Sequence, residues 1–178
     1  MTLPTAYFAP VGWYKASMKE PYRIEVLESF PKQTYRNRCV ITSPNGLVTL
    51  SVPVCRVEHK QLTRDIEISY QQHWQHQHKI ALISAYKRTP YFDYYQEYIL
   101  PLYDTKYKYL KDFNHHCHSV VTELMHNRRP TVAQPLQETD IWQPLDLERY
   151  WGDGLSILDF LMEYGPETIR YIENYERD

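Results

Sequence analysis

Three cations fall within seven residues of one short segment that leads into a run of strand-forming residues. The segment reads Lys32-Gln33-Thr34-Tyr35-Arg36-Asn37-Arg38. Because side chains alternate along a strand, we expect Arg36 and Arg38 to share one face. Two guanidinium groups on one face can grip a phosphate or carboxylate, with Lys32 adding charge and Gln33 and Asn37 orienting the substrate. The alternative interpretation is a solvated, charged start of a strand.

A second candidate segment is the aromatic stretch at residues 7–14. It predicts the end of a strand, a corner at Pro10 and then the start of a helix. Free N–H groups at a helix start bind anions, and ligands of α/β sheets lie beyond the ends of strands. Tyr7, Pro10, Gly12 and Trp13 are therefore candidates for the wall of a substrate pocket. The alternative is that this aromatic cluster belongs to the core.

Six histidines form two clusters, which are His73, His76 and His78, and His115, His116 and His118. A spacing of three residues would put two members of each cluster on one helical face. Asp112 and Cys117 lie near the second cluster and would suit zinc. No HExxH or paired-cysteine pattern accompanies them, and Cys117 falls on an apolar helical stripe, so we predict no metal site.

Four carboxylates are further candidates for a general acid or base: Asp93, Asp153, Asp159 and Glu163. Asp93 follows a Thr-Pro break and could instead favour the start of a helix through the helix dipole. The sequence contains no glycine-rich phosphate loop, no GxSxG elbow and no signature of a Cys/His dyad.

The elements that must position these residues change in character near residue 70. Strands are predicted over residues 5–9, 23–27, 37–42, 47–54 and 65–70, and the turn Ser43-Pro44-Asn45-Gly46 predicts a hairpin. Helices are predicted over residues 11–18, 73–88, 91–103, 107–126, 156–162 and 166–175. Residues 127–145 are proline-rich and predict a loop. In the helix of residues 73–88 we expect Ile80, Ile83 and Tyr86 on the buried face.

The predicted fold is α/β, with one domain over residues 1–178. Its N-terminal half is rich in strands, with a hairpin at about 37–54, and its helical C-terminal half packs on the sheet. Gly165 is expected to cap the first of the last two helices, and Pro166 to begin the next.

Composition excludes several classes of protein. The 178 residues carry 20 Lys and Arg against 22 Asp and Glu, a net charge of −2, which argues against a nucleic-acid binder. The three cysteines, an odd and sparse set, favour a reducing compartment. We find no apolar run long enough to span a membrane and no signal peptide. We therefore expect a cytoplasmic protein, either monomeric or a homo-oligomer.

Five blocks of residues, in order, resemble one known family. They are residues 7–14, residues 28–39, residues 50–54, the pattern Trp74, His78, Tyr86 and Pro90-Tyr91-Phe92, and residues 155–161 followed by Gly165-Pro166-Glu167. Together they resemble the WbqC-like family of bacterial proteins, in its short, Bacteroidetes-type form. That family is linked to genes for surface polysaccharide, including O-antigen, while the reaction and any cofactor stay unknown.

The resemblance implies a site at the cationic segment and at the helix that carries His78 and Tyr86. These two residues are eight apart, so they can share a face. We expect an enzyme of polysaccharide biosynthesis that transfers a group on an anionic, sugar-nucleotide-like small molecule, with His78 as general acid or base near neutral pH and Tyr86 as a second catalytic residue. Arg36→Ala should then abolish binding and leave Tm nearly unchanged. Two alternatives remain: a non-catalytic module that binds a glycan precursor or a partner enzyme, and a zinc hydrolase that uses the histidine clusters.

Overall fold

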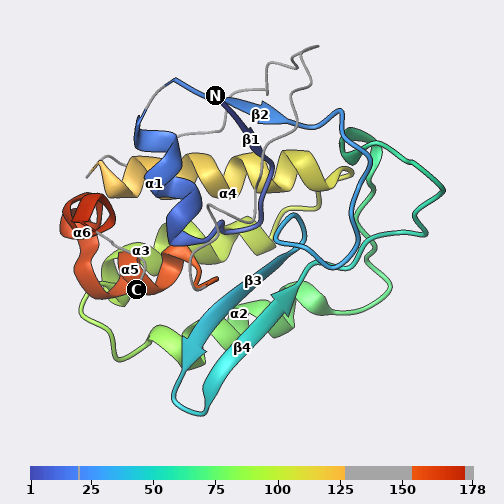
Figure 1. Ribbon diagram of the computed structural model, residues 1–178. Helices are drawn as coiled ribbons and strands as arrows, with labels where there is room; N and C mark the ends of the chain where they lie inside the picture. Colours follow the sequence, from blue (N-terminus) through green and yellow to red (C-terminus); the bar gives the residue numbers. More distant parts are fainter. Residues whose placement is uncertain (20, 127–153, 175–178) are drawn as a thin grey trace.

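Short strands and the helices that surround them make up the described part of the chain, residues 1–19, 21–126 and 154–174, in the computed structural model (Figure 1). The strands are β1 (Thr2–Pro4), β2 (Arg23–Glu25), β3 (Arg38–Ser43) and β4 (Gly46–Ser51). The α-helices are α1 (Val11–Lys19), α2 (Trp74–Tyr86), α3 (Phe92–Ile99), α4 (Leu110–Met125), α5 (Ile157–Tyr164) and α6 (Thr168–Asn174). Short 3-10 helices are η1 (Thr63–Asp65), η2 (Leu100–Tyr103) and η4 (Gly165–Glu167). The predicted loop at 127–145 and the candidate Asp153 lie outside the described residues.

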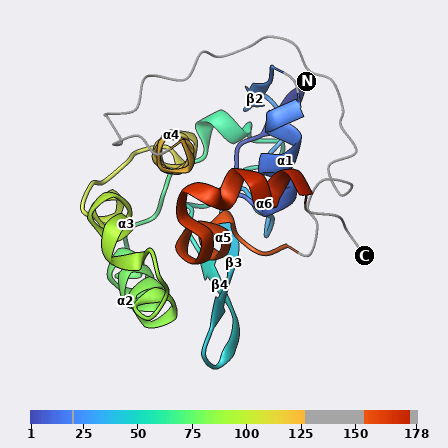
Figure 2. The ribbon, with the colours of Figure 1, turned by 90° about the vertical axis from the view of Figure 1, so that its left-hand side faces the viewer.

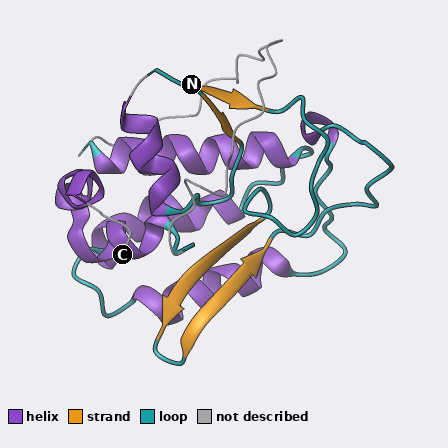
Figure 3. Cartoon of the chain, viewed as in Figure 1, coloured by secondary structure: helices purple, strands orange, loops and turns teal. Residues whose placement is uncertain are grey.

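The predicted hairpin is confirmed, although it is shorter than expected. β3 and β4 pair antiparallel from Arg38↔Ser51 to Ser43↔Gly46, so Pro44 and Asn45 form the loop. β1 and β2 form a separate parallel pair (Figure 3). The strand-rich first half and the helical second half agree with the predicted fold class, but the strands form two small sheets.

Two predicted strands are wrong. Residues 5–9 form a turn after β1, and Phe8 has a φ of 40°, which a strand does not allow. Within residues 65–70, Asp65 ends η1, and Glu67 and Ile68 form only the single bridges Glu67↔Tyr109 and Val54↔Ile68. In both segments the apolar residues alternate or cluster because the chain crosses the core there. Burial alone therefore explains the strand-like pattern.

The helices lie close to their predicted positions. α4 buries the predicted residues from Leu110 to Leu124, together with Asn114. α2 turns a different face inward, because its buried residues are Trp74, His78, Leu82 and Tyr86. The expectation for Ile80 and Ile83 is wrong, since both are exposed. The shared face of His78 and Tyr86 is confirmed.

The buried residues form one cluster that runs from Leu3 to Ile172 and is dominated by aromatic rings. α2 and α5 both contact β3. Figure 2 shows the tip of the hairpin extending beyond the helices, with α2 and α3 to one side and α1 and α6 to the other. Gly165 ends α5 with a φ of 53°, which confirms the predicted cap. Among the described residues, no helix has the length and apolar character needed to cross a membrane.

Candidate functional site

Two of the blocks identified in the sequence meet at the edge of β3. The segment at residues 155–156 forms bridges on both sides, Val40↔Leu155 and Pro10↔Ser156. The Ser156 hydroxyl donates to the Phe8 carbonyl at 3.0 Å and accepts from the Leu158 N–H at 3.2 Å, so it also caps α5. The C-terminal block is therefore held between the aromatic–proline block and the hairpin, and it directs α5 towards the end of β3.

The cationic segment does not form the predicted strand face. Residues 32–37 are turns, and β3 begins only at Arg38. The buried Arg36 donates from Nε to Oε1 of Glu28 at 2.5 Å and from Nη1 to Oγ1 of Thr34 at 3.3 Å. Its carbonyl accepts from Nδ2 of Asn114 at 2.7 Å. Arg36 is thus part of an internal network, which differs from the expected pair of guanidinium groups on one face of a strand.

The other members of that segment have different surroundings. Arg38 is half-buried, and its Nε forms no hydrogen bond to the described residues. Asn37 is buried and donates from Nδ2 to the Val52 carbonyl at 3.0 Å. Lys32 and Gln33 lie on an exposed turn, where Gln33 has a φ of 62°. Among these residues Arg38 has the clearest capacity to bind an anion. The predicted binding roles of the whole segment stay predictions.

The aromatic–proline block lies mainly in the core. Trp13 is buried and donates from Nε1 to the Pro4 carbonyl at 2.9 Å. It lines a small cavity of about 10 Å³, which is room for one water molecule. Pro10 is buried and Gly12 is half-buried in the first turn of α1. The first amide of α1, that of Val11, donates to the Leu155 carbonyl, so this group is not available to an anion.

His78 and Tyr7 come together although they are far apart in the chain. Nδ1 of His78 lies 2.9 Å from the Tyr7 hydroxyl, which also hydrogen-bonds the Tyr103 hydroxyl. The ring of Trp74 packs edge-on against His78. Burial lowers the pKa of His78 to about 4, partly offset by the Ser51 carbonyl. The imidazole is therefore neutral at neutral pH, contrary to the expected pKa near 7, and its catalytic role stays a prediction.

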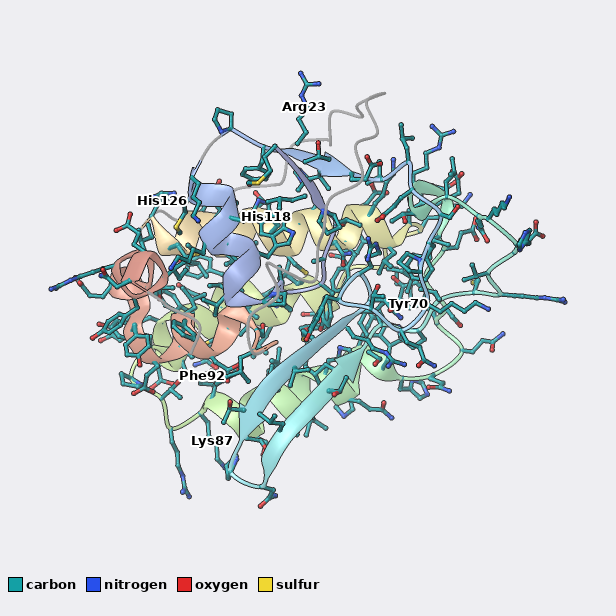
Figure 4. All side chains as sticks on the ribbon, in the orientation of Figure 1. Arg23, Tyr70, Lys87, Phe92, His118 and His126 are labelled. Atoms are coloured by element: carbon teal, nitrogen blue, oxygen red, sulfur yellow. The ribbon has the colours of Figure 1, made fainter. Side chains whose placement is uncertain are left out.

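The histidine clusters do not converge on a metal site in the described part of the chain, where no group of three or more His, Cys, Asp or Glu side chains is arranged to hold an ion. His118 is hydrogen-bonded by Tyr22 at 2.6 Å, beside α1 (Figure 4). His116 is hydrogen-bonded by Tyr107. His73 and His76 line an open cleft at the start of α2. The described geometry gives the zinc-hydrolase alternative no support.

A cleft of about 420 Å³ lies between the end of β3, the end of α2 and α5. It brings together three candidates from two helices that are distant in the chain, namely Tyr86 from α2 and Asp159 and Glu163 from α5. The carboxylates are four residues apart on α5 and share a face. Oδ1 of Asp159 accepts from the Thr42 N–H at 2.9 Å, which ties α5 to β3.

Tyr86 is the most deeply buried of these three groups. Its hydroxyl is inaccessible to solvent and forms no hydrogen bond to the described residues. Burial, with the nearby carboxylate of Asp159, raises its pKa well above 10, so the phenol stays protonated and can donate a hydrogen bond but cannot act as a base. A protonated donor and two carboxylates are the groups that acid–base chemistry on a hydroxyl substrate requires, and all three residues line this cleft, with the Tyr86 hydroxyl and Oδ2 of Asp159 themselves inaccessible to solvent.

Arg36, Arg38 and His78 do not line this cleft, the cavity beside Trp13 or the cleft at the start of α2. Asp93 lies in the first turn of α3, where it accepts from Gln96, and is exposed. Sequence reasoning missed Asn114, which joins α4 to the cationic segment. Its signal was a polar side chain within the apolar stripe of a helix.

Comparison with known proteins identifies a family. The sequence model of the WbqC-like protein family matches residues 24–140, which include the cationic segment, the hairpin and α2 to α4. The matched range ends before α5. No curated protein and no solved structure matches the chain.

Proposed function

The chain belongs to the WbqC-like protein family, and from this premise we propose that it is an enzyme of bacterial surface-polysaccharide biosynthesis, of the O-antigen type. In this proposal it transfers a group on an anionic, sugar-nucleotide-like substrate in the cytoplasm. The observation that carries the proposal is the meeting of Tyr86, Asp159 and Glu163 in one cleft of about 420 Å³. A cleft of this size can hold a sugar unit with part of its leaving group.

The roles follow from protonation and position. Asp159 would accept the proton of the attacking hydroxyl, because one of its oxygens is fixed by the Thr42 N–H and its carboxylate is thereby oriented. Tyr86, whose raised pKa keeps it protonated, would donate a hydrogen bond to the oxygen on which charge develops, and this role requires a side-chain movement that brings its solvent-inaccessible hydroxyl to the cleft. The exposed Glu163, one turn further along α5, would accept hydrogen bonds from the sugar hydroxyls.

The anionic part of the substrate is assigned to Arg38. Arg38 and Thr42 are four residues apart on β3, so their side chains point to the same face, about 13 Å apart along the strand. An extended molecule can therefore reach from the cleft, which Thr42 lines, to a half-buried guanidinium that has no ion pair among the described residues. Lys32 on the neighbouring turn would add a longer-range attraction.

A non-catalytic binding module for a glycan precursor is the second candidate, and one observation favours it. The rings of Phe160 and Tyr164 line the same cleft, with centroids 5.6 Å apart in an edge-to-face arrangement. Aromatic faces beside carboxylates suit the binding of a sugar ring whether or not a reaction follows.

The experiment is to incubate the purified chain with a panel of sugar nucleotides and hydroxyl acceptors, to follow binding by thermal shift and to follow products by mass spectrometry. Product formation that Asp159→Asn abolishes supports the enzyme. Asparagine retains an oxygen for the Thr42 N–H, so Tm should hold, and the exposed Glu173→Gln on α6 is the matched charge control. Binding without product supports the module, and the absence of both refutes the proposal.

A further inference from the structure

A second cleft, of about 320 Å³, opens at the N-terminal end of α2. Its walls are the residues that lead into α2, the first turns of that helix and the residues that follow η2. Tyr70 lies beside this cleft, and Lys87 marks the opposite end of α2 (Figure 4). The cleft is therefore separated by the length of α2, about 20 Å, from the cleft that holds Tyr86.

Positive charge dominates the lining of this second cleft. Lys79 and Lys106 both reach it, against the single carboxylate of Asp104, and His73 and His76 add two imidazole rings. Nζ of Lys79 forms an ion pair with Oδ1 of Asp104 at 2.5 Å. Lys106 forms no ion pair with the described residues, and its Nζ lies 5.4 Å from the centre of the Tyr70 ring. One lysine charge is therefore not neutralised.

The start of α2 adds to the positive electrostatic potential of this cleft. No side chain caps the helix, because His73 occupies the cap position without forming a cap hydrogen bond, and the first turn contains no acidic residue. The first N–H groups of a helix have no partner within the helix and carry partial positive charge. The helix thus begins at the cleft with amides that an anion can satisfy.

The walls are held in place before any ligand arrives. Nε2 of Gln75 donates to the carbonyls of Tyr103 at 2.6 Å and Thr105 at 3.1 Å. The Tyr70 hydroxyl donates to the Tyr107 carbonyl at 2.9 Å and accepts from the Tyr107 N–H at 2.8 Å. These contacts cross from one wall to the other, so a ligand would lose little free energy in ordering the site.

We propose that this cleft binds the phosphate group of a small phosphorylated molecule, with Lys106 and Lys79 as its cationic contacts. An aqueous cleft with flexible ammonium groups and a helix start matches a compact, multiply charged anion. This inference goes beyond the proposed function, because the cleft lies apart from Tyr86 and Asp159 and does not depend on any reaction there. It also does not involve Arg38.

The test is a calorimetric titration of the full chain with inorganic pyrophosphate. We expect saturable binding of one equivalent, with a Kd below about 1 mM. Lys106→Ala should weaken it by about tenfold or more, because a charge-assisted contact to phosphate is lost. Lys87→Ala removes the same charge from the other end of α2 and should change the Kd by less than about twofold, since screening is strong over that distance.

Asp104→Asn gives a change in the opposite direction. Removing this carboxylate releases Lys79 from its ion pair and removes a repulsive charge, so pyrophosphate should bind several-fold more tightly. Absence of saturable binding, or equal weakening by Lys106→Ala and Lys87→Ala, overturns the proposal. The readout is binding alone, so either result leaves the product assay with Asp159→Asn unaffected.

Discussion

The hydroxyl of Tyr7 lies 2.9 Å from Nδ1 of His78 in the centre of the protein, although 71 residues separate them in the chain. Both residues are buried, and the Tyr103 hydroxyl extends the network. Polar groups removed from water are costly unless they are paired, and here each one finds a partner. The network therefore joins the N-terminal block, α2 and η2 through groups that remain neutral.

Two histidines, the buried His78 and the half-buried His118, should make the protein sensitive to acid. Burial lowers the pKa of His78 and of His118 to about 4, from 6.5 in an unfolded chain. Above pH 6.5 both histidines are neutral in the folded and in the unfolded chain, so they do not lower the free energy of unfolding. As the pH falls towards 4 the unfolded state binds protons that the folded state does not, so the free energy of unfolding should fall by about 2 kcal/mol per histidine between about pH 7 and pH 5. Urea unfolding at each pH measures this.

Carboxylates also contribute to acid unfolding, so the comparison must be made with variants. His78→Gln with His118→Gln should be less stable at neutral pH but should lose less stability on acidification. His59→Gln, at an exposed position, should retain the slope of the wild type. An unchanged slope in the double variant would contradict the prediction.

The difference between predicted and observed structure follows from the range of the interactions. The Asn45-Gly46 turn and the stripe from Leu110 to Leu124 are local signals, and β3, β4 and α4 lie where they predict. No local signal marks the buried face of α2. Ile80 and Ile83 are as apolar as Leu82, and only packing against the neighbouring elements decides which of them is buried.

The candidate site was predictable to a smaller extent for the same reason. The sequence indicates Tyr86, Asp159 and Glu163 as separate candidates, but 73 residues separate Tyr86 from Asp159, and no periodic pattern brings them together. The spacing of Arg36 from Arg38 suits a strand and therefore predicts a ligand-binding cation. The ion pair of Arg36 with Glu28 needs the chain to turn at residues 32–37, and charge spacing does not show that turn.

Arg36 should therefore be a structural residue, which reverses the expectation from sequence. Its side chain is 5% exposed and pairs with Glu28 at 2.5 Å. Arg36→Ala leaves a carboxylate without its partner in a partly buried position, and we expect a loss of about 3 kcal/mol in the free energy of unfolding. Denaturant titration measures this loss. Arg38→Ala, at a half-buried position with no ion pair among the described residues, should lose less than half as much free energy of unfolding. An unchanged Tm in Arg36→Ala would contradict the structural role of Arg36.

Gly165 should not tolerate a side chain. Its φ of 53° disfavours other residues, and a Cβ there would overlap the ring of Tyr91. That ring belongs to the Pro-Tyr-Phe segment at the start of α3, so the substitution strains the contact between α3 and α5. We expect Gly165→Ala to lower stability by about 2–4 kcal/mol. Gly46→Ala is the control, because its φ is 107° but no atom lies within 4 Å of an added Cβ, so that variant should lose only about 1 kcal/mol.

Tyr86→Phe should separate stability from function. The Tyr86 hydroxyl is buried and forms no hydrogen bond to the described residues, so its removal relieves a desolvated polar group at almost constant volume. We therefore expect thermal stability to stay within about 1 kcal/mol of the wild type or to rise. If the hydroxyl donates to the substrate in the cleft, product formation should fall by about tenfold to a hundredfold. Tyr94→Phe, at an exposed position on α3, should change neither quantity. A stable Tyr86→Phe protein with full activity would remove Tyr86 from the catalytic group and leave the carboxylates of α5 as its only members.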